Sequence, residues 1–423
     1  MRDLFADLEA RGLVQESTDR AALAARLAPG AGPITLYYGC DPSADSLHHG
    51  NLIGLVMLRR FQDAGHQAIA LAGGATGMVG DPSGRSEERN LLDDATLDHN
   101  VAAIKEQIAR IVDLTDGRGR LVDNRDWTQP ISLLEFLRDV GKHATVNQMI
   151  ARESVRNRMA SEQGISYTEF SYMLLQANDY LWLHDHLGCD LQVGGSDQWG
   201  NIVSGVDLIR RTRRTHAHAM AWPLLTAADG TKLGKTTGAR LWLDPAKTSP
   251  FQFHQHWVQL DDRDVERQLP IFSLRPMTEI TELLAVNAAS PERRAAQRAL
   301  ADEVTALVHG PTAAAAAGEA AALLFGGDPL TASVPALEAL AREVSTVVAA
   351  PDDEIVGLLV RSGLTGSNSD ARRQLQQGSV LANGSVVAGD GDLASVALLH
   401  GRWLLLRRGK RSFALADFLP QPG

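Results

Sequence analysis

A histidine, a glycine and an asparagine lie close together in one short segment of this 423-residue chain. His48, Gly50 and Asn51 follow an apolar run and begin an amphipathic stretch, which is the order of a strand, a turn and a helix. Backbone amides at the start of a helix favour anions, and a glycine there lets a ligand approach the main chain. A histidine beside this opening can donate to a phosphate without acting as a base. The segment therefore predicts an anion site, and the alternative is a strand-to-helix turn without a ligand.

A second segment places two lysines three positions apart among glycines. Lys232 and Lys235, with the hydroxyl of Thr236 beside them, would form a mobile cationic clamp suited to a polyphosphate. The spacing of a P-loop is absent, so Walker-type chemistry is not supported. The alternative is a solvated surface loop.

One predicted helix carries a polar stripe on an apolar background. A capping-box pattern before it and a glycine after it predict a helix over residues 167–187. Tyr172, Gln176 and Asp179 then fall at positions i, i+4 and i+7, on one face. Such polar groups need a partner when they are buried, so they predict the wall of a pocket for a small polar ligand. The alternative is a stripe that faces solvent.

Two glycine-rich segments each contain an acid. Residues 73–85 contain Asp81, which could meet a substrate ammonium group, although such segments are commonly mere turns. Residues 194–201 place Asp197 and Gln198 after glycines at the end of an apolar run. A carboxylate at the end of a strand can hold ribose hydroxyls, so this segment predicts a nucleoside contact.

The elements that must position these side chains follow the pattern of a parallel α/β sheet. Residues 34–38, 67–72 and 191–193 are short apolar runs that predict strands, and residues 50–64 predict a helix between the first two. Open sheets of this kind bind ligands beyond the carboxyl ends of their strands. The fold class expected for the first 220 residues is therefore α/β with a Rossmann-like parallel sheet.

The rest of the chain changes character twice. Residues 250–326 are expected to be almost wholly helical, and residues 327–352, with three prolines, are expected to connect two parts. From Glu354 on, short helices precede short apolar runs at 379–381, 385–387 and 403–406, which predicts a small α+β domain.

Composition excludes several classes of protein. An apolar content of 44% with 22% charged residues excludes a disordered or collagen-like chain. The sequence shows no membrane span and no signal peptide, so we expect a cytoplasmic protein without a membrane partner. Cys40 and Cys189 match neither a disulfide framework nor a metal site. The net charge is −10, but residues 353–423 hold eight basic against six acidic residues, which suits either an RNA contact or a solvated charged edge.

Taken together, these segments resemble one family, the bacterial tyrosyl-tRNA synthetases, along essentially the whole chain. Residues 48–51, H-H-G-N, resemble the H-I-G-H signature of class I synthetases, and residues 232–236, K-L-G-K-T, resemble K-M-S-K-S. Further matching segments are Y-Y-G-C-D-P at 37–42, G-D-P-S-G at 80–84 and G-G-S-D-Q-W-G-N at 194–201. From residue 375 on, the chain resembles a small RNA-binding fold named after a protein of the small ribosomal subunit.

Two positions depart from these signatures. Asn51 stands where the first signature ends in histidine, and asparagine can still donate a hydrogen bond. Gly234 replaces the serine in the middle of the second, so that hydroxyl is absent.

The resemblance implies an enzyme that activates L-tyrosine with ATP to tyrosyl-adenylate and then transfers tyrosine to the terminal adenosine of tRNA(Tyr). Mg²⁺ is expected to arrive with ATP, and no dedicated metal site is expected. The residues implied to bind tyrosine are Tyr37, Asp81, Tyr172, Gln176, Asp179 and Gln198, with Tyr37 and Asp179 on the phenol hydroxyl. Those implied to bind ATP are Gly39, Asp41, His48, Gly50, Asn51, Gly195, Asp197, Lys232 and Lys235. The catalytic residues implied are His48, Asn51, Lys232, Lys235 and Thr236.

The resemblance also implies a domain order and a homodimer. The expected parts are a Rossmann-like catalytic domain with an inserted helical segment (1–225), a helical domain with the lysine segment that contacts tRNA (226–330), a linker (331–352) and a small RNA-binding domain (353–423). Residues 130–160 read as ordinary core, and the family places a dimer interface near them. The alternatives are a tryptophanyl-tRNA synthetase, an RNA-binding derivative without activity and a nucleotidyltransferase of the same superfamily.

Overall fold

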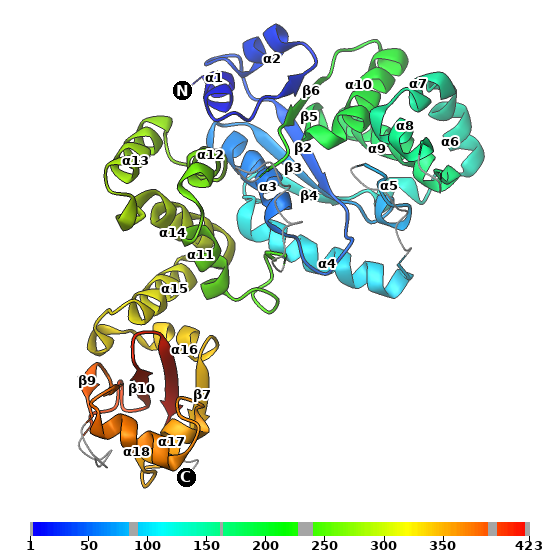
Figure 1. Cartoon of the computed structure of the whole chain (residues 1–423). Helices are drawn as coiled ribbons and strands as arrows, with labels where there is room; N and C mark the ends of the chain where they lie inside the picture. Colours follow the sequence, from blue (N-terminus) through cyan, green and yellow to red (C-terminus); the bar gives the residue numbers. More distant parts are fainter. Residues whose placement is uncertain (1–2, 84–91, 161–163, 227–239, 388–395, 419–423) are drawn as a thin grey trace. The chain divides into compact units, whose positions relative to one another are not determined.

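The chain forms two compact units in the computed structural model, which describes residues 3–83, 92–160, 164–226, 240–387 and 396–418 (Figure 1). The first unit contains Met1–Lys247 and Leu260–Ala296, and the second contains Thr248–Gln259 and Gln297–Gly423. Every described residue that was predicted to bind a substrate lies in the first unit.

A six-stranded sheet in the order β1-β6-β5-β2-β3-β4 forms the centre of the first unit. All neighbouring strands run parallel except β1 and β6, which confirms the expected α/β class with a mostly parallel sheet. The strands are β1 (Glu16–Ser17), β2 (Thr35–Cys40), β3 (Gln67–Ala72), β4 (Gly119–Asp123), β5 (Cys189–Gly195) and β6 (His218–Trp222). The three predicted strands are β2, β3 and β5. Strands β4 and β6 were not predicted, because each contains only two large apolar residues.

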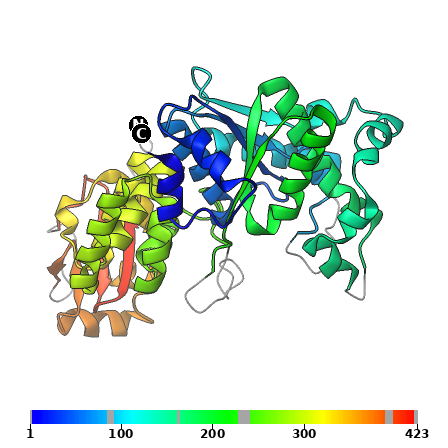
Figure 2. The ribbon, with the colours of Figure 1, turned by 90° about the horizontal axis from the view of Figure 1, so that it is seen from above.

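Helices cover both faces of this sheet (Figures 1 and 2). Helix α3 (His49–Asp63) connects β2 to β3, whereas α10 (Trp199–Arg213) connects β5 to β6 in the opposite direction along the sheet. Because such crossovers are right-handed, α3 and α10 pack on opposite faces, and the direction of the chain reverses between β2 and β5. The other helices of this unit are α1 (Leu4–Ala10), α2 (Arg20–Leu27), α4 (Asp94–Ile111), α5 (Arg125–Thr128), α6 (Leu133–Asp139), α7 (Val146–Ile150), α8 (Glu153–Met159), α9 (Tyr167–Leu187), α12 (Asp262–Phe272) and α13 (Met277–Ala289).

Helix α9 has the bounds that the sequence predicted. The hydroxyl of Ser166 accepts a hydrogen bond from the amide of Glu169, and Gly188 ends the helix in the left-handed conformation with φ of 61°. Tyr172, Gln176 and Asp179 therefore lie within one continuous helix at the spacing i, i+4 and i+7, as predicted.

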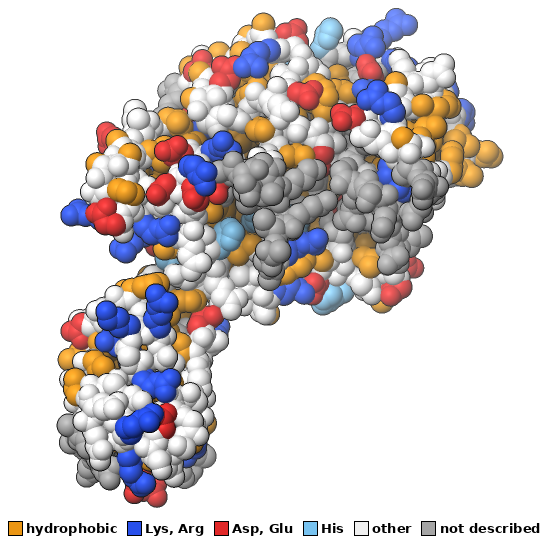
Figure 3. Space-filling view, in the orientation of Figure 1, with side chains coloured by type: hydrophobic (Ala, Val, Ile, Leu, Met, Phe, Trp, Pro, Cys, Tyr) orange, Lys and Arg blue, Asp and Glu red, His pale blue; other side chains and the backbone are white. Residues whose placement is uncertain are grey.

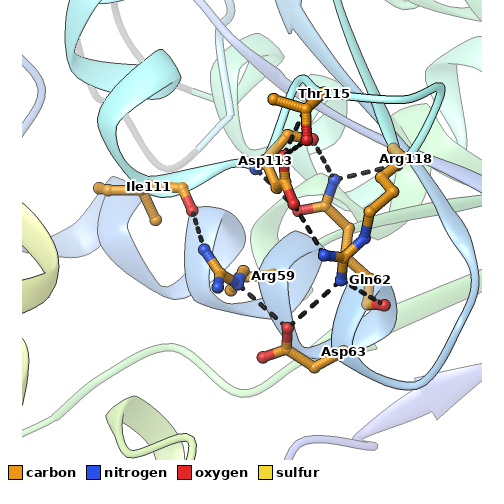
Figure 4. Close-up of polar contacts among 7 residues, drawn as sticks. All are labelled: Arg59, Gln62, Asp63, Ile111, Asp113, Thr115 and Arg118. Atoms are coloured by element: carbon orange, nitrogen blue, oxygen red, sulfur yellow. Dashed lines mark hydrogen bonds and ion pairs between the residues drawn. The ribbon is translucent and has the colours of Figure 1, made fainter.

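The carboxyl end of α3 is fixed to the loop that enters β4 (Figure 4). The Gln62 amide nitrogen donates to the carbonyls of Asp113 (2.6 Å) and Arg118 (2.9 Å), and its oxygen accepts from the Asp113 amide (3.0 Å). Arg59 and Arg118 both pair with Asp63, at 3.1 and 3.6 Å. Helix α3, which follows His48, is thus held in a defined position relative to β4.

The second unit combines helices with a smaller sheet in the order β7-β11-β10-β8-β9. Its helices are α11 (Pro250–Val258), α14 (Ala295–His309), α15 (Pro311–Leu324), α16 (Val334–Ala341), α17 (Ile355–Arg361) and α18 (Asn368–Gln376). Its strands are β7 (Ser345–Val348), β8 (Val380–Ala382), β9 (Ser385–Val386), β10 (Trp403–Arg408) and β11 (Ser412–Asp417). This sheet and the helices on it form the expected α+β part.

Residues 331–352, predicted as a linker, contain regular structure. Helix α16 buries Leu337 and Leu340, and β7 pairs in parallel with β11. The prolines of this segment suggested a connection, but Pro335 lies in the first turn of α16, where the missing amide proton has no intrahelical role.

The reading of residues 130–160 as ordinary core is wrong for α6. Leu133, Leu134 and Leu137 are 71%, 77% and 43% exposed, and apolar side chains gather where α6 lies, at the right of Figure 3. Local spacing does not show which face of a short helix meets the core, so this exposure was not predictable. In the described residues, none of the helices has the length and apolar character needed to cross a membrane.

Candidate active site

A cleft of about 700 Å³ opens at the carboxyl ends of β2 and β5, where the chain direction reverses. Open α/β sheets bind their ligands at this position. Thirteen predicted site residues line it: Tyr37, Gly39, Asp41, His48, Gly50, Asn51, Asp81, Tyr172, Gln176, Asp179, Gly195, Asp197 and Gln198. The other three, Lys232, Lys235 and Thr236, fall outside the described residues.

A buried carboxylate lies at the inner end of the cleft. Asp179 of α9 is 2% exposed, and its two oxygens accept from Trp127 Nε1 at 2.8 Å and Asn124 Nδ2 at 2.9 Å. Burial raises the pKa of Asp179 to about 7, although both hydrogen bonds favour the ionised form and oppose the shift. The neighbouring Tyr37 is also buried, and burial together with the charge of Asp179 raises the pKa of its phenol. The Asp179 carboxylate can therefore accept a hydrogen bond from a ligand hydroxyl, and the neutral Tyr37 hydroxyl can donate one to it.

Some buried polar atoms of the cleft lack a hydrogen-bond partner among the described residues. They include the Tyr37 hydroxyl and the side-chain oxygens of Gln176 and Gln192. Buried polar groups in folded proteins are nearly always paired, so unpaired ones that converge on a cleft indicate groups that a polar ligand satisfies.

Asn124 is a central residue that sequence reasoning missed. It follows β4 and is fully buried, and its side-chain nitrogen donates to Asp179 and also to the Thr76 hydroxyl at 3.0 Å. Its oxygen accepts from the Ala75 amide at 2.7 Å. The signal that could have found it is its place directly after a strand, but β4 itself was not recognised.

The hydroxyl of Tyr172 points to a second carboxylate. It donates to Asp41 Oδ2 at 2.8 Å, while the Thr76 hydroxyl donates to Asp41 Oδ1 at 2.7 Å. The oxygen of Tyr172 keeps a lone pair, and the Gln176 oxygen is unpaired, so this part of the cleft offers acceptors to a cation. Asp41, predicted on the ATP side, thus contacts a residue predicted on the tyrosine side.

Asp81, Gln198 and Asn201 form a network on the other side. Gln198 Nε2 donates to Asp81 Oδ2 at 2.6 Å, and the Ser83 amide donates to Asp81 Oδ1 at 2.9 Å. Asn201 Nδ2 donates to Gln198 Oε1 at 3.2 Å. The network holds the Asp81 carboxylate at the cleft, and Asn201 is a member that the sequence did not single out.

The segment with His48 forms the start of α3. His48 Nδ1 accepts from the Gly50 amide at 3.0 Å, and Asn51 Oδ1 accepts from the His48 amide at 3.2 Å, which makes a reciprocal capping box. A Cβ on Gly50 would lie 2.8 Å from His48 Cε1, so the ring position requires glycine. Asn51, which stands where the signature has histidine, has a structural role because its side chain accepts from the His48 amide.

The charge state of His48 follows from its surroundings. Burial, and to a smaller extent the charge of Arg240, lower its pKa to about 4, so the ring is neutral near pH 7. Since Nδ1 accepts from Gly50, the proton resides on Nε2. The N-terminus of α3 thus presents the neutral Nε2 donor of His48 at the positive end of the helix dipole, which suits a phosphate.

Known protein families and relatives match this chain along nearly its whole length. Residues 30–326 match the family model of class I tRNA synthetases (W and Y), and residues 336–416 match that of the tyrosine–tRNA ligase C-terminal domain. The chain is 50% identical to a tyrosine–tRNA ligase of Opitutus terrae over 98% of this chain and 99% of that protein. It is 49% identical to one of Kineococcus radiotolerans over the full length of both.

Solved structures show the same fold. A C-terminally truncated mitochondrial tyrosyl-tRNA synthetase of Aspergillus nidulans matches with a TM-score of 0.70 and 31% identity, over 77% of this chain and 95% of that one. A tyrosyl-tRNA synthetase of Archaeoglobus fulgidus, complexed with L-tyrosine, matches with a TM-score of 0.53 and 19% identity, over 74% and 99%. The chain belongs to the tyrosine–tRNA ligase family of class I tRNA synthetases.

Proposed function

We propose that this chain activates L-tyrosine with ATP in the cleft between β2 and β5 and then transfers it to tRNA(Tyr). The observation that carries the proposal is the unpaired Tyr37 hydroxyl next to the Asp179 carboxylate. A phenol that donates to Asp179 and accepts from Tyr37 would satisfy the buried donor. Phenylalanine has no hydroxyl, so it would leave the Tyr37 hydroxyl unpaired and would give Asp179 no further donor, which is the physical basis of discrimination against it.

The remaining groups suit the rest of the amino acid. Tyr172, Gln176 and Asp81 offer oxygen acceptors to the ammonium group. Gln198, held by its hydrogen bond to Asp81, is proposed to contact the carboxylate. This arrangement orients the tyrosine carboxylate towards the half of the cleft that contains His48.

ATP is proposed to occupy that half. His48, Gly50 and Asn51 face its phosphates, Asp197 its ribose, and Gly39 and Gly195 allow close approach to the backbone. The tyrosine carboxylate then attacks the α-phosphorus in line, and pyrophosphate leaves with the magnesium ion that entered with ATP. Lys232, Lys235 and Thr236 are proposed to bind the departing pyrophosphate. The reaction needs positioning and donors for growing charge rather than a general base.

The second unit is proposed to contact the tRNA. Basic residues gather on and beside β10 and β11, namely Arg402, Arg407, Arg408, Lys410 and Arg411, and Lys and Arg side chains line the face of this unit seen in Figure 3. Such a group suits the phosphates of RNA. Alanine at Arg407 and Arg408 should lower charging of tRNA while leaving adenylate formation near the wild-type rate.

The chain is also proposed to act as a homodimer. Its support is the exposed apolar surface of α6 with Leu133, Leu134 and Leu137, together with nearby exposed residues Val146 and Ile150. Apolar surface of this kind on a globular chain marks an interaction site.

The decisive experiment is ATP–pyrophosphate exchange with tyrosine, phenylalanine and tryptophan tested separately. We expect exchange with tyrosine only, and loss of measurable tyrosine binding in Asp179→Ala. Exchange with tryptophan instead would assign the sister activity. Absence of exchange with all three, in folded protein that binds RNA, would replace the enzyme by an RNA-binding protein.

A further inference from the structure

The segment that follows the lysine motif is paired with the segment that contains His48. The His49 amide donates to the Leu241 carbonyl at 3.0 Å, and the Leu243 amide donates to the Leu47 carbonyl at 2.9 Å. His48 and Trp242 consequently lie opposite each other in an antiparallel bridge. The pairing gives Trp242 a defined place beside the first signature, although the two are nearly 200 positions apart in sequence.

Side-chain contacts hold the same segment further along. Lys247 Nζ pairs with Asp45 Oδ1 at 2.8 Å, and the Asp244 amide donates to the Ser46 hydroxyl at 3.1 Å. Both contacts reach the loop between β2 and α3. Residues 240–247 are therefore held against this loop, and Arg240 and Trp242 among them form a wall of the cleft.

The indole ring of Trp242 packs against the side chain of Arg240. The Arg240 guanidinium lies over the indole ring at 5.2 Å from its centroid, and the His48 ring meets the indole edge-on at 6.3 Å. Arg240 and Trp242 both line the cleft with His48. Stacking on an aromatic face restricts a long arginine side chain without neutralising it.

No carboxylate in the described part of the chain lies within ion-pair distance of Arg240. After burial, the positive charge of Arg240 is the second cause of the lowered pKa of His48. The guanidinium therefore acts electrostatically on a residue that lines the cleft. Three sources of positive potential thus converge: the amides at the N-terminus of α3, the Nε2 proton of His48 and the Arg240 guanidinium. Neither signature motif includes Arg240.

We propose that Arg240, held over Trp242, is a further substrate-binding residue that contacts the phosphates of ATP. The proposal rests on the proposed function, since it places ATP in this cleft. The guanidinium forms charge-assisted hydrogen bonds to phosphate oxygens, and its position on a wall paired with residues 47–49 aligns the phosphates with His48. Tyrosine, at the inner end, does not contact it.

The test compares full-length variants in tyrosine-dependent ATP–pyrophosphate exchange. Arg240→Ala should raise the KM for ATP about tenfold or more, the usual effect of losing one charge-assisted hydrogen bond. The dissociation constant for tyrosine, measured at equilibrium without ATP, should stay at the wild-type value. Arg240→Lys should recover part of the ATP affinity, because it keeps the charge but not the planar fork.

A matched control is available outside the cleft. Arg20 is also exposed and lies over an aromatic ring, that of Phe5, at 5.6 Å. Arg20→Ala should leave the KM for ATP unchanged. Trp242→Leu should raise it as Arg240→Ala does, and Trp242→Phe should raise it less, because phenylalanine retains an aromatic face.

Two results would overturn the proposal. One is an unchanged KM for ATP in Arg240→Ala. The other is a raised KM for tRNA in charging with normal exchange kinetics, which would assign Arg240 to RNA. Both differ from failure of the proposed function, which the wild-type protein alone would reveal by showing no exchange.

Discussion

Asp179 is the residue where burial and hydrogen bonding act in opposite directions on one carboxyl group. Burial favours the protonated form and raises the pKa to about 7, whereas the donors Asn124 and Trp127 favour the ionised form. A phenol that donates to this carboxylate adds a third donor, so tyrosine binding would lower this raised pKa and release a proton. Affinity for tyrosine is therefore coupled to pH near neutrality.

This coupling predicts that the dissociation constant for tyrosine rises as the pH falls from about 8 to about 6, by up to about tenfold at one unit below the pKa. The ionised carboxylate is the better acceptor, and its population decreases in this range. Equilibrium titrations at several pH values measure the effect. Asp179→Asn, which cannot ionise, should show weak binding that is independent of pH. A flat profile for the wild type would contradict the prediction.

Asn124 connects this carboxyl group with Thr76 and Ala75, so its removal should affect binding through Asp179. Asn124→Ala is expected to weaken tyrosine binding about tenfold and to move the pH dependence upwards, because one stabilising donor is lost. Asn287 is the control: it is also buried and bridges two partners, Asp262 and Ala296. Asn287→Ala should lower the melting temperature but leave tyrosine affinity intact. Equal effects of the two variants on binding would show a purely structural role for Asn124.

At the scale of elements, the anion site is positioned by helix α3 together with the strands β2 and β3 that it connects. The capping box of α3 orients His48, and the Gln62 contacts fix the opposite end of α3. Close packing of α3 on β2 is possible because Gly54 faces Tyr38, where a Cβ would lie 2.1 Å from the ring. The position of the helix therefore depends on one missing methyl group.

Gly54→Ala is expected to destabilise the protein and to impair ATP binding, because α3 or Tyr38 must move. Gly357 in α17 is the matched helical glycine, with no atom within 4 Å of an added Cβ. Gly357→Ala should instead be neutral or stabilising by up to about 1 kcal/mol, from helix propensity alone. Thermal unfolding and the KM for ATP distinguish the two variants. Similar behaviour of both would show that the close approach has no consequence.

At the scale of the whole molecule, the exposed leucines of α6 predict association. Replacing Leu133 and Leu134 by aspartate should halve the mass measured by sedimentation equilibrium, because burying unpaired charges in an apolar interface is costly. Val286 of α13, 53% exposed, is the control, and its replacement by aspartate should not change the mass. A wild-type protein that is already monomeric at micromolar concentration would refute the dimer.

Local patterns in the sequence determined which segments carry the chemistry. Helix α9 could be predicted to the residue, because its cap, its periodicity and its final glycine all lie within about twenty positions. The strand-end glycines likewise indicated the cleft, since ligands bind to such sheets at the ends of strands. Thirteen of the predicted site residues meet there because the order of strands in a parallel sheet brings these ends together.

Tertiary structure alone decided which other residues join them. Asn124 reaches Asp179 across 55 positions, and Trp242 lies opposite His48 through pairing of backbones that no local pattern encodes. The same holds for exposure: the leucines of α6 look like core in sequence and face solvent in the fold. A sequence pattern shows the neighbours of a residue along the chain. The pKa of a group, its burial and its hydrogen-bond partners depend instead on neighbours in space, which only the packing of the elements determines.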